Sequence, residues 1–453
     1  MSLELPVLGT LPESWEVVPF GEVLDGGTRN GIYKKKEFHG RGARIVNMGE
    51  LFGHPRLFDV EMKRVELTEK EIAKAGLEAG DLLFARRSLV AEGAGKCSLV
   101  CEVNEPTTFE SSIIRARPDA SKVDSHFLYY MFSSPFGKYI LGTIRRTVAV
   151  SGITGTDLVT LEIPVPPLPE QRAIASILGA LDDKIELNRR MNATLESLAR
   201  AIFKSWFVDF DPVHVNAGKI NAGQMPASSA IPTTQDPKVL DLFPSTFQDS
   251  ELGPIPEGWS AMPISEAVKI NPRRTLPKGT IAKYLDMKNV PTRGHRPDEI
   301  IDREMKSGTK FINGDTLMAR ITPCLENGKT AFVDFLPDGE VGWGSTEFIV
   351  LRPRPPLPNE YGYFLARDPD VRQHAIKNMT GTSGRQRVAK ECFDSYLIPV
   401  PTEGVANEFA KVIEPLMSSI KTASEEGARL SDARDALLPK LLSGELPVPL
   451  EVA

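Results

Sequence analysis

One segment near the end of the second half concentrates side chains that could bind nucleic acid. From Thr380 to Arg387, hydroxyl side chains and two glycines precede an Arg-Gln-Arg run. Arginine and glutamine donate hydrogen bonds to base edges, while hydroxyl and backbone N–H groups bind phosphate oxygens. We interpret the segment as a candidate nucleic-acid contact loop. Its candidate contact residues are Thr382, Ser383, Arg385, Gln386 and Arg387.

A second segment, in the first half of the chain, has a related composition. Thr143 to Thr147 contains Arg145 and Arg146 and precedes a Ser-Gly pair. Arg86 and Arg320 each follow a Gly-Asp turn and an apolar run, in corresponding places of the two halves, so they are supporting candidates. The alternative for Arg86 and Arg320 is an ion pair with a carboxylate inside the fold.

Two Gly-Lys pairs resemble the end of a phosphate-binding P-loop. They are Gly95-Lys96 and Gly328-Lys329. A P-loop requires another glycine at a fixed earlier position, and these positions hold Val90 and Pro323. We interpret both pairs as turns, and the sequence predicts no cofactor site.

Charged triplets offer one alternative function, that of a metal-dependent nuclease. Asp298 with Glu304-Met305-Lys306 distantly resembles a nuclease carboxylate set, and Glu61-Met62-Lys63 repeats the triplet. Such an enzyme needs convergent carboxylates around Mg²⁺. The spacing is short, so solvated charged residues are the favoured interpretation. The cysteines form neither a disulfide framework nor a zinc-site pattern. The sequence thus predicts no catalytic and no metal-binding residue.

The chain contains an internal repeat on the scale of a domain. Ile163 to Pro166 returns as Ile398 to Pro401, 235 residues later, and Gly80 to Arg86 matches Gly314 to Arg320. Solenoid repeats are about 20 to 50 residues long, so each copy is a complete domain. Two similar halves give pseudo-two-fold symmetry, and duplex DNA is the commonest linear partner that matches such symmetry.

A long helix is predicted from Pro169 to Phe207. Its apolar residues recur with the spacing of a coiled-coil seam, and the segment 235 residues later keeps the same register. Asn188 and Asn192 occupy neighbouring seam positions. Buried asparagines can fix register and orientation. The alternative, which the sequence supports equally, is that this stretch is exposed to the helices of a partner.

Composition and charge limit the class of protein. The 453 residues, of which 41% are hydrophobic and 25% charged, provide material for two cores. No uninterrupted apolar run of about 18 residues and no signal-peptide pattern occurs, so we expect no membrane association and a cytoplasmic protein. The net charge of −6 argues against a uniformly basic coating protein, but basic residues are clustered locally, for example at Lys34-Lys35-Lys36.

An α+β fold is predicted in each half. Short β-prone runs such as 82–84 and 347–351 occur together with helix-prone segments at 126–132 and 360–367. The expected division of the chain is a first globular domain at 1–166, a first long helix at 167–208, an irregular linker at 209–253, a second globular domain at 254–401 and a second long helix at 402–446.

Several ordered segments resemble those of type I restriction-modification DNA specificity (S) subunits. Pro167 to Ala175, Leu181 to Asn188 and Ser205 to Pro212 resemble their first conserved helical region, Glu251 to Trp259 the entry into their second target-recognition domain, and Leu441 to Leu446 their C-terminal motif. The resemblance covers almost the whole chain. It implies two target-recognition domains separated by a pair of long antiparallel coiled-coil helices, each domain recognising one part of a bipartite sequence in double-stranded DNA.

The same resemblance implies partners. In this family the helices hold the spacing of the two domains and dock methyltransferase (modification) subunits, the complex can include a restriction/translocase subunit, and the S subunit is noncatalytic by itself. The second helical region departs from the family pattern at Pro401 to Asn407. Besides the nuclease, a coiled-coil adaptor without sequence preference stays open. The candidate docking residues on the first helix are Glu170, Gln171, Asn188 and Asn192.

Overall fold

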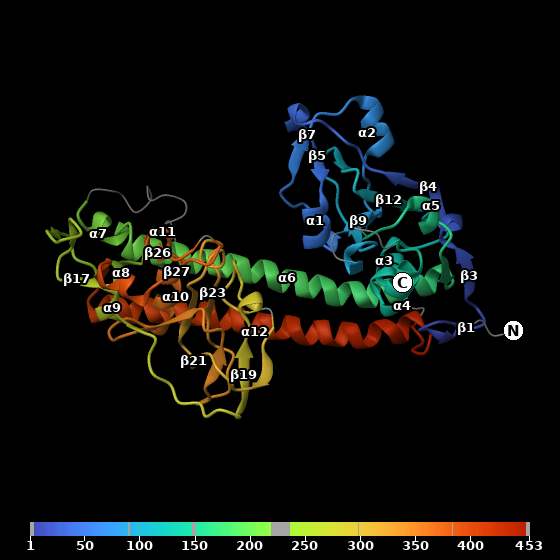
Figure 1. Ribbon diagram of the computed structural model, residues 1–453. Coiled ribbons are helices and arrows are strands. Elements are labelled where there is room, and N and C mark those ends of the chain that lie inside the picture. Colours follow the sequence, from blue (N-terminus) through green and yellow to red (C-terminus); the bar gives the residue numbers. More distant parts are fainter. Residues whose placement is uncertain are drawn as a thin grey trace. The chain divides into compact units, whose positions relative to one another are not determined.

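The computed structural model describes residues 4–88, 91–146, 151–218, 236–297, 299–382 and 384–449. The chain forms two compact units: unit 1 contains Met1–Ile185 and Ala428–Ala453, and unit 2 contains Glu186–Gly427. Each unit combines strands with short helices, and two long helices contribute to both (Figure 1). The α+β class predicted from the sequence is confirmed.

The larger sheet of unit 1 has five strands in the order β4-β12-β8-β10-β6. Its central strand β8 is apolar and buried throughout. Leu82 and Phe84 belong to one hydrophobic core and Leu83 and Ala85 to another, because successive side chains of a strand point to opposite faces. Both faces of the sheet are therefore covered. The strands are β4 (Leu24–Asn30), β6 (Arg56–Leu57), β8 (Leu82–Ala85), β10 (Cys97–Val100) and β12 (Ile113–Pro118).

A smaller sheet lies at the end of unit 1 that is farthest from helix α6 (Leu168–Phe207) (Figure 1). Strand β5 pairs in parallel with β11 and antiparallel with β7. Helix α2 begins after Thr68, which forms a capping box with Glu71. Helices α3 and α4 lie near α6. These elements are β5 (His39–Val46), β7 (Lys63–Val65), β11 (Thr107–Phe109), α1 (Met48–Gly53), α2 (Glu69–Ala75), α3 (Ser125–Ser133) and α4 (Pro135–Thr143).

Unit 2 repeats this plan with two four-stranded sheets, in the orders β18-β25-β22-β23 and β20-β19-β24-β21. In the central strand β22, Leu317 and Met318 enter different cores, as their counterparts in β8 do. The elements are β18 (Val268–Ile270), β19 (Ile281–Leu285), β20 (Ile301–Glu304), β21 (Thr309–Phe311), β22 (Thr316–Ala319), β23 (Thr330–Phe332), β24 (Gly342–Gly344), β25 (Phe348–Pro353), α10 (Asn359–Arg367) and α11 (Pro369–Lys377).

The second long helix is α12 (Glu403–Leu442), and α6 and α12 each have 40 residues. Within unit 2, Asn188 of α6 donates a hydrogen bond to Glu426 of α12 at 2.8 Å, and Asn192 donates one to Ser424 at 2.9 Å. The residue numbers of the bonded partners decrease on α12 as they increase on α6. The two helices are therefore antiparallel, as expected. The two compact units divide both helices, and the five-part division of the chain stays a prediction.

Candidate nucleic-acid interface

The candidate segment of unit 2 is a β-hairpin. Strands β26 (Met379–Thr380) and β27 (Arg387–Val388) are antiparallel, with Thr380 opposite Arg387. Gly381 and Gly384 have φ angles of 125° and 80°, in the left-handed region that favours glycine. The two glycines therefore permit the turn, and Ser383 lies outside the described residues.

The cationic side chains of this hairpin differ in their surroundings. Arg387 donates hydrogen bonds to both carboxylate oxygens of Glu347, at 2.7 to 3.0 Å, and these bonds raise the pKa of the Arg387 guanidinium. Gln386 is half-buried, whereas Thr382 and Arg385 are exposed. Among the described residues, no hydrogen-bond or ion-pair partner is found for the Arg385 side chain. Arg385 is thus available to a phosphate or a base edge.

The candidate segment of unit 1 also closes on itself. The backbones of Arg146 and Gly152 exchange hydrogen bonds of 2.9 and 3.1 Å. Strand β13 (Ser151–Gly152) pairs with β9 (Arg87–Ser88). Residues 147–150, which include Thr147, lie outside the described part of the chain.

Both arginines of this segment have partners within unit 1. Arg146 donates to the two carboxylate oxygens of Asp157, at 2.8 and 3.0 Å, and its side chain is largely exposed. Arg145 is half-buried and donates to the backbone oxygen of Ala94 at 3.1 Å. Arg146 therefore resembles Arg387 in having one carboxylate partner, although Arg146 is exposed and Arg387 is half-buried.

Arg86 and Arg320 lie at the bases of the two candidate segments. The backbone N–H of Ile153 donates to the oxygen of Arg86 at 3.0 Å, and that of Val388 donates to the oxygen of Arg320 at 2.9 Å. The same connection is thus made in both units. The Arg86 guanidinium donates to the backbone oxygen of Ser111 at 3.3 Å. The described residues provide no carboxylate partner for Arg86 or Arg320.

The lysines of the two Gly-Lys pairs donate hydrogen bonds to backbone oxygens. Lys96 Nζ donates to the backbone oxygen of Phe52 at 3.0 Å, and Lys329 Nζ donates to that of Met287 at 2.7 Å. Gly95 and Gly328 have positive φ angles of 88° and 72°. Both pairs are turns, and each lysine tethers a neighbouring segment of its own unit.

The residues of the nuclease alternative do not converge in the part of the chain that the structure describes. Glu304 lies in strand β20, where it pairs with Ile281. Glu61 is exposed, and Asp298 lies outside the described residues. No group of three or more histidine, cysteine or carboxylate side chains that could hold a metal ion occurs within the described ranges.

Comparisons with known proteins point to one family. The model of the type I restriction modification DNA specificity domain matches residues 12–197. The type I restriction enzyme MjaIX specificity subunit of Methanocaldococcus jannaschii is 24% identical over 455 residues, which cover 97% of this chain and 95% of that protein. The HindI specificity subunit of Haemophilus influenzae is 25% identical over 454 residues, covering 89% and 94%. This chain is similar to type I restriction enzyme specificity subunits along most of its length.

A solved structure agrees with this assignment at the level of the fold. The crystal structure of a type I restriction-modification S subunit from M. genitalium superimposes with a TM-score of 0.55 at 14% identity, over 97% of this chain and 99% of that one. Likeness at this identity concerns architecture alone. The fold of this chain therefore has a solved counterpart.

Two of the candidate docking residues are buried in this chain. Gln171 is 0% exposed; its side chain accepts a hydrogen bond from the backbone of Asp124 and donates one to that of Pro166, both at 2.8 Å. Asn188 is 2% exposed and bonds to α12. Neither leaves side-chain surface for a partner, which corrects that part of the docking prediction, and the bonds of Asn188 suit a residue that fixes helix register. Glu170 and Asn192 are half-buried, and docking by them stays a prediction.

Sequence analysis missed the carboxylates beside the hairpin arginines and two exposed apolar residues on α6. Glu347 is 40 positions from Arg387 in the sequence, so no local pattern could reveal the pair. Leu187 and Met191 are 58% and 41% exposed. They were missed because the coiled-coil spacing selects the neighbouring seam positions. Within the described residues, no helix combines the length and apolar character needed to cross a membrane.

Proposed function

We propose that this chain is the noncatalytic DNA-recognition subunit of a type I restriction-modification complex and binds a bipartite target in double-stranded DNA. The observation that carries the proposal is the repeated site: each unit places a short arginine-bearing segment against the backbone of an arginine that follows its central strand, at Arg86 and Arg320. Two copies of one contact element suit two separated parts of one target.

The chemistry of the two segments supports DNA as the ligand. Arg385 is exposed and uncommitted within the described residues, and Arg146 and Arg387 are each paired with one carboxylate. Phosphate binding by such guanidinium groups supplies affinity, while their bidentate hydrogen bonds to guanine supply base discrimination. We assign Thr382, Ser383 and Gln386 to the same contact surface. Arg145 ties the unit 1 segment to the backbone oxygen of Ala94, and the backbone oxygen of Arg86 accepts the hydrogen bond of Ile153, the residue that follows this segment.

The long helices are proposed to dock the modification subunits. Leu187 and Met191 are one helical turn apart on α6 and exposed, and exposed apolar pairs on a helix suit burial by a partner. In this proposal the five-part division of the chain is functional, with residues 167–208 and 402–446 as the docking segments. A restriction/translocase subunit completes the complex, which works in the cytoplasm.

The test uses the chain co-purified with its modification subunits. Methylated adenines in cells that carry the complete system identify the target, and a duplex with that target is compared with a scrambled duplex at fixed salt. We expect preferential binding of the target, and a loss of about 5- to 150-fold in Arg385→Ala/Arg387→Ala, the effect of a bidentate base contact. Equal affinity for both duplexes by the wild-type complex would reject the proposal in favour of the adaptor.

The nuclease alternative needs a separate measurement. The isolated chain is incubated with supercoiled DNA and Mg²⁺, and Glu304→Gln serves as the matched variant. Cleavage that Glu304→Gln abolishes would make the chain an enzyme. We expect intact DNA with both proteins.

A further inference from the structure

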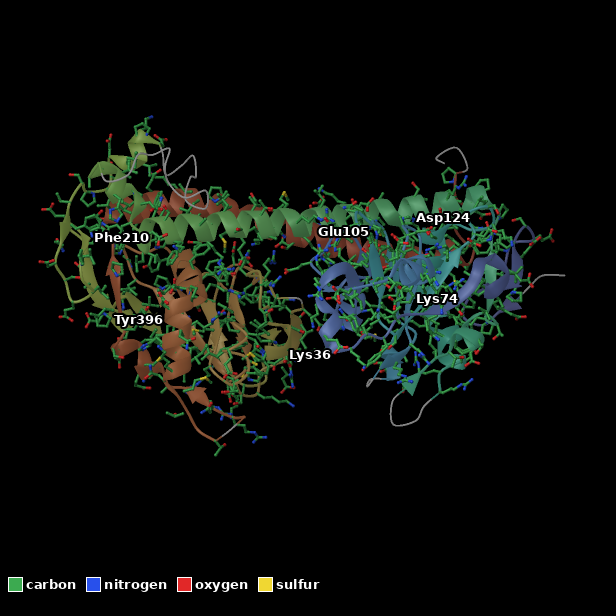
Figure 2. All side chains as sticks on the ribbon, turned by 90° about the horizontal axis from the view of Figure 1, so that it is seen from above. Lys36, Lys74, Glu105, Asp124, Phe210 and Tyr396 are labelled. Carbon is green, nitrogen blue, oxygen red and sulfur yellow. The ribbon has the colours of Figure 1, made fainter. Side chains whose placement is uncertain are left out.

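A third basic segment of the chain belongs to neither candidate hairpin. Residues 31–38 connect β4 to β5 and contain Lys34, Lys35 and Lys36. The segment lies at the end of unit 1 that is farthest from α6 (Figure 1), where Figure 2 labels Lys36, whereas Asp124 lies beside that helix. It is solvent-facing along most of its length.

The segment is fixed where it leaves the sheet. The backbone N–H groups of Gly31 and Ile32 donate to the oxygens of Ile113 and Phe109, at 3.1 and 2.9 Å. A Cβ atom on Gly31 would lie 2.2 Å from the backbone oxygen of Glu110, so this close approach requires glycine. The backbone of the segment is therefore held against β11 and β12.

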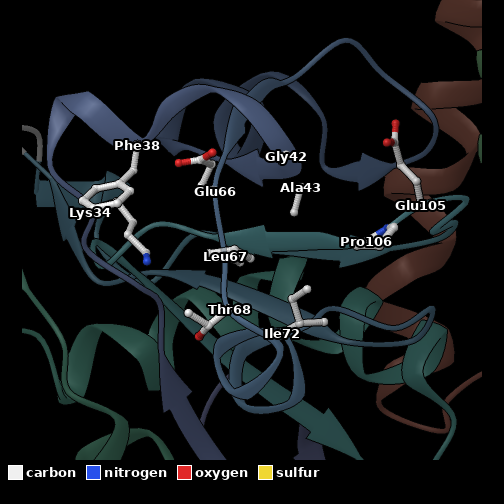
Figure 3. Close-up of a pocket in the computed structure, with 10 residues that line it drawn as sticks. All are labelled: Lys34, Phe38, Gly42, Ala43, Glu66, Leu67, Thr68, Ile72, Glu105 and Pro106. Carbon is white, nitrogen blue, oxygen red and sulfur yellow. The ribbon is translucent and has the colours of Figure 1, made fainter.

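Lys34 fixes the segment a second time. Its Nζ donates to the carboxylate of Glu71 at 2.8 Å and lies 5.1 Å from the centre of the Phe38 ring. Figure 3 shows Lys34 and Phe38 together at one side of a hollow of about 490 Å³, with Leu67 and Ile72 also in its lining. Lys34 is thus engaged within unit 1 and unavailable to a ligand.

The side chains next to Lys34 project from this fixed backbone and, among the described residues, have no comparable partner. Tyr33 is 80% exposed, and Lys35 and Lys36 are exposed. For these three side chains the described ranges contain no hydrogen-bond or ion-pair partner. An aromatic ring beside two uncommitted cations is the combination that binds nucleic-acid bases and phosphates.

Strand β4 connects this segment to helix α5 (Gly155–Leu158), which pairs with Arg146. Arg146 is bonded to Asp157 in this helix. A Cβ on Gly155 would lie 2.4 Å from Oγ1 of Thr28 in β4, so α5 is in contact with that strand. From Thr28, five residues of chain lead to Tyr33, a span of at most about 18 Å. This corresponds to about five base pairs at ~3.4 Å each.

From this arrangement we propose that Tyr33, Lys35 and Lys36 form a further DNA contact of unit 1, in addition to the segment that contains Arg146. Lys35 and Lys36 neutralise phosphates, and the Tyr33 ring packs against sugar and base edges of the adjoining groove. The inference rests on the proposed function and extends it, because it assigns the DNA contact of unit 1 to two elements.

The experiment measures binding of the target duplex and a scrambled duplex by the chain with its modification subunits, as a function of salt. For Lys35→Ala/Lys36→Ala we expect the slope of log K against log salt to become shallower by about 2, because each lost phosphate contact contributes ~0.9. Affinity for both duplexes should fall in parallel. Tyr33→Ala should weaken target binding by about 5-fold or more, and Tyr33→Phe should retain most of it.

A matched control separates local contact from total charge. Lys122→Ala/Lys138→Ala removes the same charge from the part of unit 1 around α3 and α4 and should leave the slope unchanged. If the wild-type complex prefers its target but the Lys35/Lys36 and Tyr33 variants bind like wild type, the inference is overturned while the proposed function stands. If the wild-type complex shows no preference for any duplex, the proposed function itself fails.

Discussion

Arg117 and Asp81 form a two-point ion pair in unit 1, with Nε to Oδ1 at 2.7 Å and Nη2 to Oδ2 at 2.9 Å. Asp81 also accepts a hydrogen bond from the backbone of Glu78 at 2.8 Å. Unit 2 repeats the pair with Arg352 and Asp315, at 2.6 Å. The aspartate of each Gly-Asp turn therefore has a structural role, because it joins the turn to an arginine of the neighbouring strand.

We predict that Asp315→Ala destabilises unit 2 by about 3–5 kcal/mol, because removal of one partner leaves the other charge partly buried and unpaired. The Asp315 side chain is fully buried and that of Arg352 largely so. The measurement is the free energy of unfolding in urea, and Glu66→Ala is the control, because its partner Arg41 is mostly exposed. Equal effects of the two substitutions would contradict the prediction.

The ion pair between Arg387 and Glu347 leads to a prediction about DNA binding. Glu347→Gln removes a negative charge and weakens the hydrogen bonds that Arg387 donates to residue 347. The electrostatic potential at the DNA phosphates therefore becomes more positive. We expect tighter binding of a nontarget duplex. The slope of log K against log salt should become steeper by about 1, which is the contribution of one phosphate contact. Glu391→Gln, an exposed carboxylate on a nearby 3-10 helix, is the matched control. A slope identical to wild type in Glu347→Gln would show that Arg387 does not contact phosphate.

Particular residues show how much of the fold and of the candidate interface can be predicted from the sequence. The apolar run at 82–84 predicts a strand correctly, because a strand covered on both faces requires continuous apolar residues. The composition of 380–387 predicts a loop, and the structure forms a β-hairpin there. The partner of Arg387 could not be predicted, since Glu347 is 40 residues away. Equally, Lys34 and Lys35 are adjacent and identical in type, and only the fold shows that Lys34 is paired with Glu71, 37 residues away.

The Lys34 and Glu71 pair predicts a dependence of stability on pH. The hydrogen bond from Lys34, together with one from the backbone of Thr68, lowers the pKa of Glu71 to about 2. Because this pKa lies below the ordinary value of about 4.3, the pair stabilises the fold fully above that value. The stabilisation is lost as pH falls towards 2. We expect Lys34→Met to be less stable than wild type at pH 7 and to lose less stability on acidification.

Thermal unfolding between pH 7 and pH 2.5 tests this prediction. Lys35→Met is the control, because it removes the same charge from a side chain without a partner among the described residues. Its unfolding temperature should follow that of wild type across the range. Parallel curves for Lys34→Met and wild type would mean that the pair contributes nothing to stability.

The exposed apolar pair on α6 predicts where the modification subunits bind. Leu187→Glu/Met191→Glu should prevent stable assembly, because burial of two such side chains is worth about 1.5–3 kcal/mol each and a buried unpaired carboxylate is costly. The chain itself should fold normally, since both positions are exposed. Size-exclusion chromatography of co-expressed subunits measures assembly. Ile281→Glu, at a 72% exposed position in β19, should assemble like wild type, and assembly of the Leu187→Glu/Met191→Glu variant would place the docking surface elsewhere.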